Sequence, residues 1–188
     1  MADQIINIQN VVATASVGQN FDLRSIARTI PGVEYRPETF PGLVYRLKKP
    51  KTATLIFSSG KMVCTGAKSE RQSKKAVMKV LEDLKKSGIV ITRKPDIQIQ
   101  NIVASAGLGG TIDLEKTTYS LERTMYEPEQ FPGLIYRMND PKVVILLFTS
   151  GNLVITGAKK EEEVLLAVTV LKKRLEEKEL IRYKKEQQ

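Results

Sequence analysis

The segment Phe-Pro-Gly-Leu-Val-Tyr-Arg at residues 40–46 decides the fold, because it returns almost unchanged as Phe-Pro-Gly-Leu-Ile-Tyr-Arg at residues 131–137. The segment Ile-Gln-Asn-Val-Val-Ala-Thr-Ala at residues 8–15 returns in similar form at residues 99–106, with the same offset of 91 residues. At that offset, and without a gap, 33 of the 77 positions from Ile8 to Leu84 are identical. Two copies of one supersecondary unit predict a pseudo-two-fold molecule, which suits a target with approximate two-fold symmetry such as duplex DNA.

Each copy predicts one order of elements, with period-2 patterns for strands and spacings of three and four for helices. In the first copy these are a strand over 5–13, a short helix from about Asp22 to Ile30, strands over 42–48, 53–58 and 61–66, and a helix over 69–86. Asp22 is expected to cap the short helix. The second copy repeats this order, and its long helix is expected from about Lys160 to Glu179.

The pattern indicates an α+β fold in which helices cover one face of an antiparallel sheet and leave the other face open. Strand alternation places one set of side chains together on the open face, namely Asn10, Val12, Leu55, Phe57, Val63 and Thr65. The opposite set is expected under the helices and consists of Val11, Ala13, Ile56, Met62 and Cys64. Because both sets are largely apolar, burial of both faces within a larger core is the alternative.

Composition narrows the class of function. Thirty Lys and Arg against 21 Asp and Glu give a net charge of +9, which suits a polyanionic partner but also a merely solvated surface. The chain has no histidine and a single cysteine, Cys64, so zinc sites of the usual kind, Ser-His-Asp triads and Cys-His dyads are excluded. We expect no enzyme activity, no metal and no cofactor. No apolar run approaches the roughly 20 residues of a membrane helix, and no signal peptide is recognised, so an intracellular protein is expected.

The repeated motifs together resemble those of the TATA-box-binding protein family, most of all its archaeal form. Gln-Asn-Val-Val, Phe-Pro-Gly-Leu-Val-Tyr-Arg and Phe-Ser-Ser-Gly-Lys-Met-Val-Cys-Thr-Gly-Ala-Lys each occur twice in order, in exact or closely similar form, and the resemblance spans residues 5–181. It implies a curved, saddle-shaped, ten-stranded antiparallel sheet with four helices on its convex face. It also implies a first repeat over 5–91, a second over 96–182 and a short polar tail over 183–188.

The function implied by the resemblance is general transcription initiation by binding of A·T-rich promoter DNA in the minor groove. Phe40 with Phe57, and Phe131 with Phe148, are similar to the pairs that wedge between base steps and kink the duplex. For a lone Phe, core packing would be the usual role, but these are matched pairs, each 17 residues apart, on the face expected to be open.

The remaining DNA-binding residues are also implied by the resemblance. Asn10 and Asn101 would donate hydrogen bonds to minor-groove acceptors. The groove floor would meet Val12, Leu55, Val63, Thr65, Val103, Leu146, Val154 and Thr156, with Pro41 and Pro132 beside the wedges. Phosphates would be contacted by Arg46, Lys51, Lys61, Arg137 and Lys142. The chain departs from the family pattern at Thr39, Gln130 and Asn152, so no phosphate contact is assigned there.

Charge distinguishes the two ends of the repeat. Residues 1–91 carry 15 basic and 7 acidic side chains, whereas residues 92–188 carry 15 and 14. Arg36 in the first repeat corresponds to Glu127 in the second, and Glu127 with Glu129 resembles the acidic loop that contacts transcription factor B in the family. RNA polymerase would be recruited indirectly through that factor. The resemblance further implies a nucleoid-associated, cytoplasmic protein in an archaeon or a nuclear one in a eukaryote, and a weak homodimer in the absence of DNA.

Two other functions fit the same fold. The sheet could bind structured RNA or a protein strand, although four correctly spaced Phe residues favour DNA. A hydrolase or nuclease would need a carboxylate cluster on the open face. The acidic residues instead fall mostly in expected helices and turns.

Overall fold

The structure is a computed structural model that describes residues 4–184, and in this range it contains helices and antiparallel strands of an α+β protein, as predicted. The chain forms two compact units. The first unit is Asn10–Asn101, and the second unit combines residues 4–9 with residues 102–184. Strands β1 (Ile5–Ser16) and β5 (Asp96–Gly107) each pass from one unit into the other, so the units do not begin and end where the sequence repeats do.

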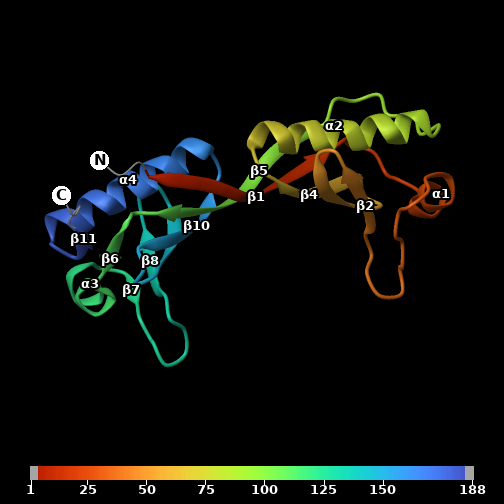
Figure 1. Ribbon diagram of the computed structural model, residues 1–188. Coiled ribbons are helices and arrows are strands. Elements are labelled where there is room, and N and C mark those ends of the chain that lie inside the picture. The colour runs from red at the N-terminus through yellow and green to blue at the C-terminus, as the bar shows by residue number, and fades with distance from the viewer. Residues whose placement is uncertain (1–3, 185–188) are drawn as a thin grey trace. The chain divides into compact units, whose positions relative to one another are not determined.

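The first unit has the strand order β2-β3-β4-β1-β5. Its other elements are α1 (Leu23–Thr29), β2 (Leu43–Lys48), β3 (Lys51–Ile56), β4 (Lys61–Ala67) and α2 (Glu70–Lys86). Asp22 caps α1 as predicted, because its side chain accepts a hydrogen bond from the Ser25 amide at 3.1 Å. Helix α2 contacts β2, β3 and β4 and covers one face of these strands (Figure 1).

The second unit continues from β1 and β5 in the order β5-β10-β9-β8-β7 and carries a separate pair, β11-β6. Its elements are β6 (Gly110–Ile112), α3 (Leu114–Ser120), β7 (Thr124–Met125), β8 (Leu134–Met138), β9 (Val143–Leu147), β10 (Asn152–Ala158), α4 (Glu161–Glu177) and β11 (Ile181–Tyr183). Helix α4 lies against β10 (Figure 1). No helix within residues 4–184 is long and apolar enough to span a membrane.

The strand count differs slightly from the ten strands implied by the resemblance. Within the described residues the main strand order contains nine, and β11 and β6 pair separately. In the first unit the equivalent of β7 is reduced to a single bridge, Glu34 to Val44, at the positions of Met125 and Ile135. A residue shortly before this pairing has a positive φ in both units, +82° at Gly32 and +61° at the equivalent Arg123. At the other end of the chain Tyr183 still belongs to β11, and residues 185–188 of the expected tail lie outside the described range.

Burial follows the alternation predicted for the strands. In the first unit Val11, Ala13, Ile56, Met62 and Cys64 are each fully buried. In α2 the residues Ala76, Val77, Val80, Leu81 and Leu84 are buried, in the predicted spacing of three and four. The core of each unit therefore lies between its strands and its long helix, which leaves the other strand face without a covering layer.

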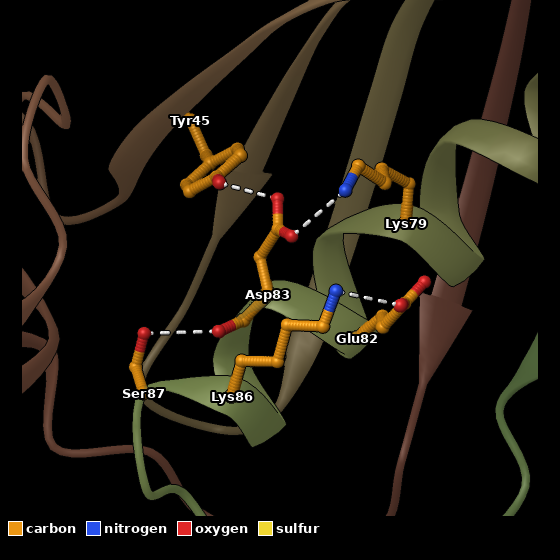
Figure 2. A network of polar contacts seen from close by, with 6 residues as sticks. All are labelled: Tyr45, Lys79, Glu82, Asp83, Lys86 and Ser87. Carbon is orange, nitrogen blue, oxygen red and sulfur yellow. Dashed lines mark hydrogen bonds and ion pairs between the residues drawn. The ribbon is translucent and has the colours of Figure 1, made fainter.

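A tyrosine connects the strands to the long helix in both units. In the first unit Tyr45 of β2 donates its hydroxyl to Asp83 of α2 at 2.7 Å, and Lys79 bonds the other carboxylate oxygen at 3.1 Å (Figure 2). In the second unit the equivalent residues are Tyr136 and Arg174, and the guanidinium donates to the tyrosine oxygen. The same contact is thus made with opposite charge, because a phenol hydroxyl both donates and accepts.

Candidate nucleic-acid interface

The uncovered strand face of the first unit is formed by half-buried side chains. Asn10, Val12, Leu55, Phe57, Val63 and Thr65 are half-buried, and each is next to at least one fully buried residue, as predicted for the open face. Strand register places Val44 beside Leu55, Leu55 beside Val63 and Val63 beside Thr14. These neighbours form a mainly apolar row across four strands, ending on the Thr14 hydroxyl.

The second unit repeats this row at equivalent positions. Ile135 pairs with Leu146, Leu146 with Val154, and Val154 with Ser105. Val103 and Thr156 are half-buried on the same side of their strands. Each unit therefore presents an apolar surface with a hydroxyl at one end, and the alternative of a core buried on both faces is not what the structure has.

The four phenylalanines form the two predicted pairs. Phe40 and Phe57 have ring centroids 6.0 Å apart at 67°, and Phe131 and Phe148 have centroids 6.0 Å apart at 71°. Phe40 and Phe131 are each 40% exposed. Edge-to-face contact is a favourable geometry for an aromatic pair, so each unit carries a preformed pair of apolar rings at its surface.

A glycine makes each pair fit. A Cβ on Gly42 would lie 2.7 Å from Phe40 Cε1 and 3.1 Å from Phe57 Cε1, and a Cβ on Gly133 would meet Phe131 and Phe148 at the same two distances. The repeated Phe-Pro-Gly sequence is thus explained locally, because the glycine leaves room for both rings.

A tight turn positions the exposed ring of each pair. The Phe40 amide donates to the Arg36 carbonyl at 2.9 Å, and the Phe131 amide donates to the Glu127 carbonyl at 3.0 Å. Pro41 and Pro132, the next residues, are exposed. The ring is therefore held by backbone bonds of its own loop as well as by its aromatic partner.

The amide of Asn10 has a fixed orientation. Gly66 N–H donates to Asn10 Oδ1 at 2.7 Å, and the side chain also bonds Thr65 Oγ1 through Nδ2 at 3.1 Å. Because a backbone N–H can only donate, the atom facing it must be the oxygen. Gly66 has φ +99° at an irregularity in the β1–β4 register, and this bulge brings its N–H to the side chain. The Asn10 oxygen is thus held by the protein, and its NH₂ group is the donor that can serve a ligand.

Two glutamines also belong to this face, although strand alternation counted from Asn10 places them on the covered side. Gln9 donates to Ser105 Oγ at 2.9 Å, and Gln100 donates to Thr14 Oγ1 at 2.9 Å. In β1 and in β5 the regular alternation is therefore interrupted at the Gln-Asn pair. Both residues of the pair lie on the open face, so the residues before the pair alternate out of step with those after it. The sequence contains no signal for this change, and the register of β1 with β4 and of β5 with β10 is irregular just after it.

A shallow hollow lies beside the inner ring of each Phe pair. One, of about 560 Å³, is lined by Phe57, Val63, Lys61, Asp96 and Gln98 among others. The other, of about 660 Å³, is lined by Phe148, Val154, Asn152, Asn7 and Ile5 among others. Asp96 brings a carboxylate to the first hollow, whereas the sequence pattern placed acidic groups away from the open face. In the second hollow Ile5 takes the place of Asp96, so the two hollows differ in charge.

The basic residues expected at phosphates are all exposed, namely Arg46, Lys51, Lys61, Arg137 and Lys142. Thr39 and Gln130, which precede Phe40 and Phe131 in sequence, are exposed. Asn152, the residue of the second repeat that corresponds to Lys61, is also exposed. Glu127 and Glu129 are exposed in the turn that precedes Phe131, close in sequence to Met125, which is 55% exposed. Their solvent exposure leaves each of these groups available to a partner.

Comparison with known proteins matches this architecture to one family. Residues 5–87 and 96–178 each match the family described as transcription factor TFIID (or TATA-binding protein, TBP). The chain is 57% identical over 155 residues to the TATA-box-binding protein of Sulfurisphaera tokodaii, covering 82% of this chain and 78% of that one. It is 52% identical over 181 residues to that of Methanothermobacter thermautotrophicus, covering 96% and 100%. Its structure is similar to that of Methanococcus jannaschii TBP, with a TM-score of 0.83 and 49% identity over 92% of this chain and 98% of the other.

Proposed function

The chain belongs to the TATA-binding protein family, and we propose that it is a general transcription factor that binds TATA-type promoter DNA through the minor groove and bends it. The observation that carries this proposal is the preformed Phe pair beside an uncovered apolar strand row, present once in each unit. An apolar surface of this kind is uncommon on a protein without a partner for it. A duplex with two similar halves would meet one such face in each unit.

The preference for A·T pairs follows from the chemistry of the row. The minor groove of an A·T pair offers only acceptors, while guanine adds an amino donor. Val12, Leu55 and Val63 in the first unit, and Val103, Leu146 and Val154 in the second, provide no acceptor for that amino group. Thr65 and Thr156 would add hydroxyl contacts at the edge. A G·C pair would bury an unpaired donor against this surface, which is unfavourable.

The amides would supply the polar contacts. Asn10 presents Nδ2 because Gly66 holds its oxygen, so it would donate to adenine N3 or thymine O2. Asn101 occupies the equivalent position of the second repeat and would act in the same way. Gln9 and Gln100, on the same face, would add donors that the motif alone did not assign.

Bending would come from insertion of the Phe pairs. A wedge must be apolar and rigid enough to replace the base stacking that it disrupts. Phe40 and Phe131, with Pro41 and Pro132 beside them, are held by their turns and by Phe57 and Phe148, so little side-chain freedom would be lost on insertion. Arg46, Lys51, Lys61, Arg137 and Lys142 would neutralise phosphates of the bent duplex.

The partners proposed for the bound complex follow from the acidic loop of the second unit. Glu127 and Glu129 would contact transcription factor B, and RNA polymerase would join through that factor. Without DNA, the apolar faces would support a weak homodimer.

The bending experiment uses energy transfer across an end-labelled duplex with a TATA-type element, and a G·C-rich duplex as control. We expect the unmodified chain to bend only the A·T-rich duplex. The Phe57→Ala/Phe148→Ala variant should bind it with little bending, because each wedge has lost its supporting ring. Equal binding to both duplexes without bending would refute promoter recognition while leaving the fold intact.

A further inference from the structure

The interface between the long helix and the strands is largely apolar in both units, but in the first unit it includes four buried polar side chains. At four equivalent positions the first unit has Thr52, Thr54, Cys64 and Ser73, each at most 6% exposed. The second unit has Val143, Ile145, Ile155 and Val164 at these positions, all buried. Thr52 and Thr54 lie on β3, Cys64 on β4 and Ser73 on the buried face of α2, and we call these four residues of the helix–strand interface the polar seam.

Two hydroxyls of the polar seam are unpaired within residues 4–184. Thr54 Oγ1 and Ser73 Oγ are fully buried and have no nitrogen or oxygen partner, and the Thr54 hydroxyl lies near the Cys64 thiol, which is a weak acceptor. Thr52 differs, because it donates to the Pro50 carbonyl at 3.2 Å. The buried hydroxyl of the second unit, Thr117, is also paired, donating to the Asp113 carbonyl at 2.6 Å. The unpaired buried hydroxyls of the described residues therefore lie in the first unit, where α2 meets its strands.

Cys64 is the single cysteine of the chain and lies inside the polar seam. Burial raises the pKa of its thiol, and the neighbouring Thr54 and Thr52 hydroxyls only partly offset this effect. With no exposed surface, Cys64 cannot react with a thiol reagent while α2 covers it. Its reaction therefore reports on separation of α2 from β3 and β4.

We propose that α2 separates from its strands more readily than α4 does from its own, and that this local opening makes Cys64 a gated modification site for thiol-reactive disulfides. An unpaired buried hydroxyl destabilises only the closed state, because in the open state water pairs with it. The Val and Ile side chains of the second unit have the opposite preference, since opening would expose them to water. The two repeats thus share a fold, but α2 separates from its strands at a lower free-energy cost than α4 does from its own.

The reaction is thiol–disulfide exchange. After opening, Cys64 loses its proton to solvent, and its Sγ attacks one sulfur of an aromatic disulfide such as Ellman's reagent. One S–S bond breaks as the mixed disulfide forms, and the aromatic thiolate that leaves is measured by its absorbance. No other thiol of the chain can contribute.

The test compares the labelling rate of the full chain with that of two double variants. Thr54→Val/Ser73→Ala removes both hydroxyls with almost no change in shape, and Thr54→Ile/Ser73→Val installs the side chains of the second unit. We expect labelling of at least one well-folded double variant to be slower by about tenfold or more, because the closed state no longer holds unpaired hydroxyls. Thr117→Val, which removes a paired hydroxyl from the second unit, should leave the Cys64 rate unchanged.

Backbone hydrogen exchange provides the second measurement. In the unmodified chain the amides of α2 should exchange faster than those of α4, by about tenfold, and Thr54→Val/Ser73→Ala should narrow this difference. The proposal is overturned if α2 exchanges as slowly as α4. It is also overturned if Cys64 labels at the rate of global unfolding, or if neither folded double variant labels more slowly.

Discussion

At the scale of single residues, Asn10 illustrates how the backbone selects the chemistry of a side chain. Gly66 N–H holds Oδ1, so the amide presents its donor and not its acceptor. The selection depends on a bulge that only a residue tolerant of φ +99° forms easily, and Gly66 is that residue. The group that Asn10 presents to a ligand is therefore decided by a residue on the neighbouring strand.

Replacing Asn10 by Asp separates the two roles of the side chain. The carboxylate still accepts from Gly66 N–H, so we expect the melting temperature to change little. It offers no donor and places a negative charge toward the groove, so affinity for a TATA duplex should fall by about a hundredfold, because the base acceptors lose their donor and face a like charge instead. Binding isotherms by fluorescence anisotropy measure this. An unchanged dissociation constant would show that Asn10 does not face the DNA.

Substitution of Gly42 tests the role of the Phe40–Phe57 pair without changing either ring, because Gly42 leaves the space that both rings occupy. Because an added Cβ would lie 2.7 Å from Phe40 Cε1, Gly42→Ala must displace one or both rings of the pair. We expect DNA bending in the energy-transfer assay to decrease markedly, with affinity lower by about tenfold, since the two rings no longer keep their edge-to-face arrangement. Gly133→Ala should act in the same way at the other pair.

The matched control for these variants is Gly88→Ala. Gly88 has φ +94° after the end of α2, and nothing lies within 4 Å of an added Cβ. This change should lower the free energy of unfolding by about 1 kcal/mol through backbone strain alone. If Gly88→Ala reduced bending as much as Gly42→Ala, loss of stability and not ring displacement would explain both.

Residue placement was predictable wherever the repeat gave two independent copies of the same motif. The Phe pairs and Asn10 were placed in this way, and the structure brings the two rings of each Phe pair together. Gln9, Gln100 and Asp96 were not predicted to join the open face, because the change of face depends on strand pairing and not on the pattern of either strand. A period-2 pattern assumes regular alternation, which bulges interrupt.

At the scale of elements, the long helices attach to their strands by the same tyrosine with different partners. Burial alone raises the pKa of Asp83, but hydrogen bonds from Tyr45 and Lys79 outweigh it and hold this pKa below its usual value. Burial and the bond to Asp83 raise the pKa of Tyr45 to about 12. The contact therefore favours an ionised Asp83 and a protonated Tyr45 across the neutral range.

Acid should weaken this attachment. Since the pKa of Asp83 is lower in the folded chain, its contribution to stability is present above the pKa of the unfolded chain and is lost as the pH falls through the folded value. Asp83→Asn should lower the free energy of unfolding at pH 7 by about 1 kcal/mol, because the bonds are no longer charge-assisted. Near pH 3 the variant and the unmodified chain should be similar. Urea unfolding at both pH values, followed by circular dichroism, measures the difference.

Glu82→Gln is the control on the same helix. Glu82 pairs with Lys86 at 2.9 Å, but both side chains are more than half exposed, so this change should have little effect at either pH (Figure 2). An equal loss of stability in Glu82→Gln and Asp83→Asn would indicate a general charge effect of the helix and exclude the Tyr45 attachment as its cause.

The elements themselves were predictable to within a few residues because caps and periodicity agree. Asp22 before α1 and the apolar spacing in α2 are local signals, and both elements form where they indicate. Strand β3 begins at Lys51, two residues earlier than expected, because it pairs with β2 up to Lys48 and leaves a turn of only two residues. Short elements such as β6, β7 and β11 have no periodicity of their own and depend on the strands they pair with, and for β6 and β11 the partner is distant in sequence.

At the scale of the whole molecule, the repeat gives the two halves the same fold, and differences between their side chains distinguish one end from the other. The two halves share the rows, the Phe pairs and the tyrosine contact, yet residues 1–91 carry 15 basic and 7 acidic groups against 15 and 14 in residues 92–188. A promoter complex must distinguish its two ends, and two units of equal fold but unequal charge can do so. The exchange of Arg36 for Glu127 marks this difference in the loop that positions the outer ring of each Phe pair.

Reversal of that charge should therefore separate DNA binding from assembly. Glu127 is exposed, and its backbone carbonyl, not its side chain, holds Phe131, so Glu127→Arg should leave bending of a TATA duplex unchanged. Recruitment of transcription factor B to the bound duplex should fall by about tenfold, because the substitution reverses the charge of a side chain at the edge of the interface with that factor. Mobility-shift titration with the factor measures this, and Arg36→Glu is the matched variant in the first repeat, expected to leave recruitment unchanged. Joint loss of bending and recruitment in Glu127→Arg would place this loop in the DNA contact and not in the partner contact.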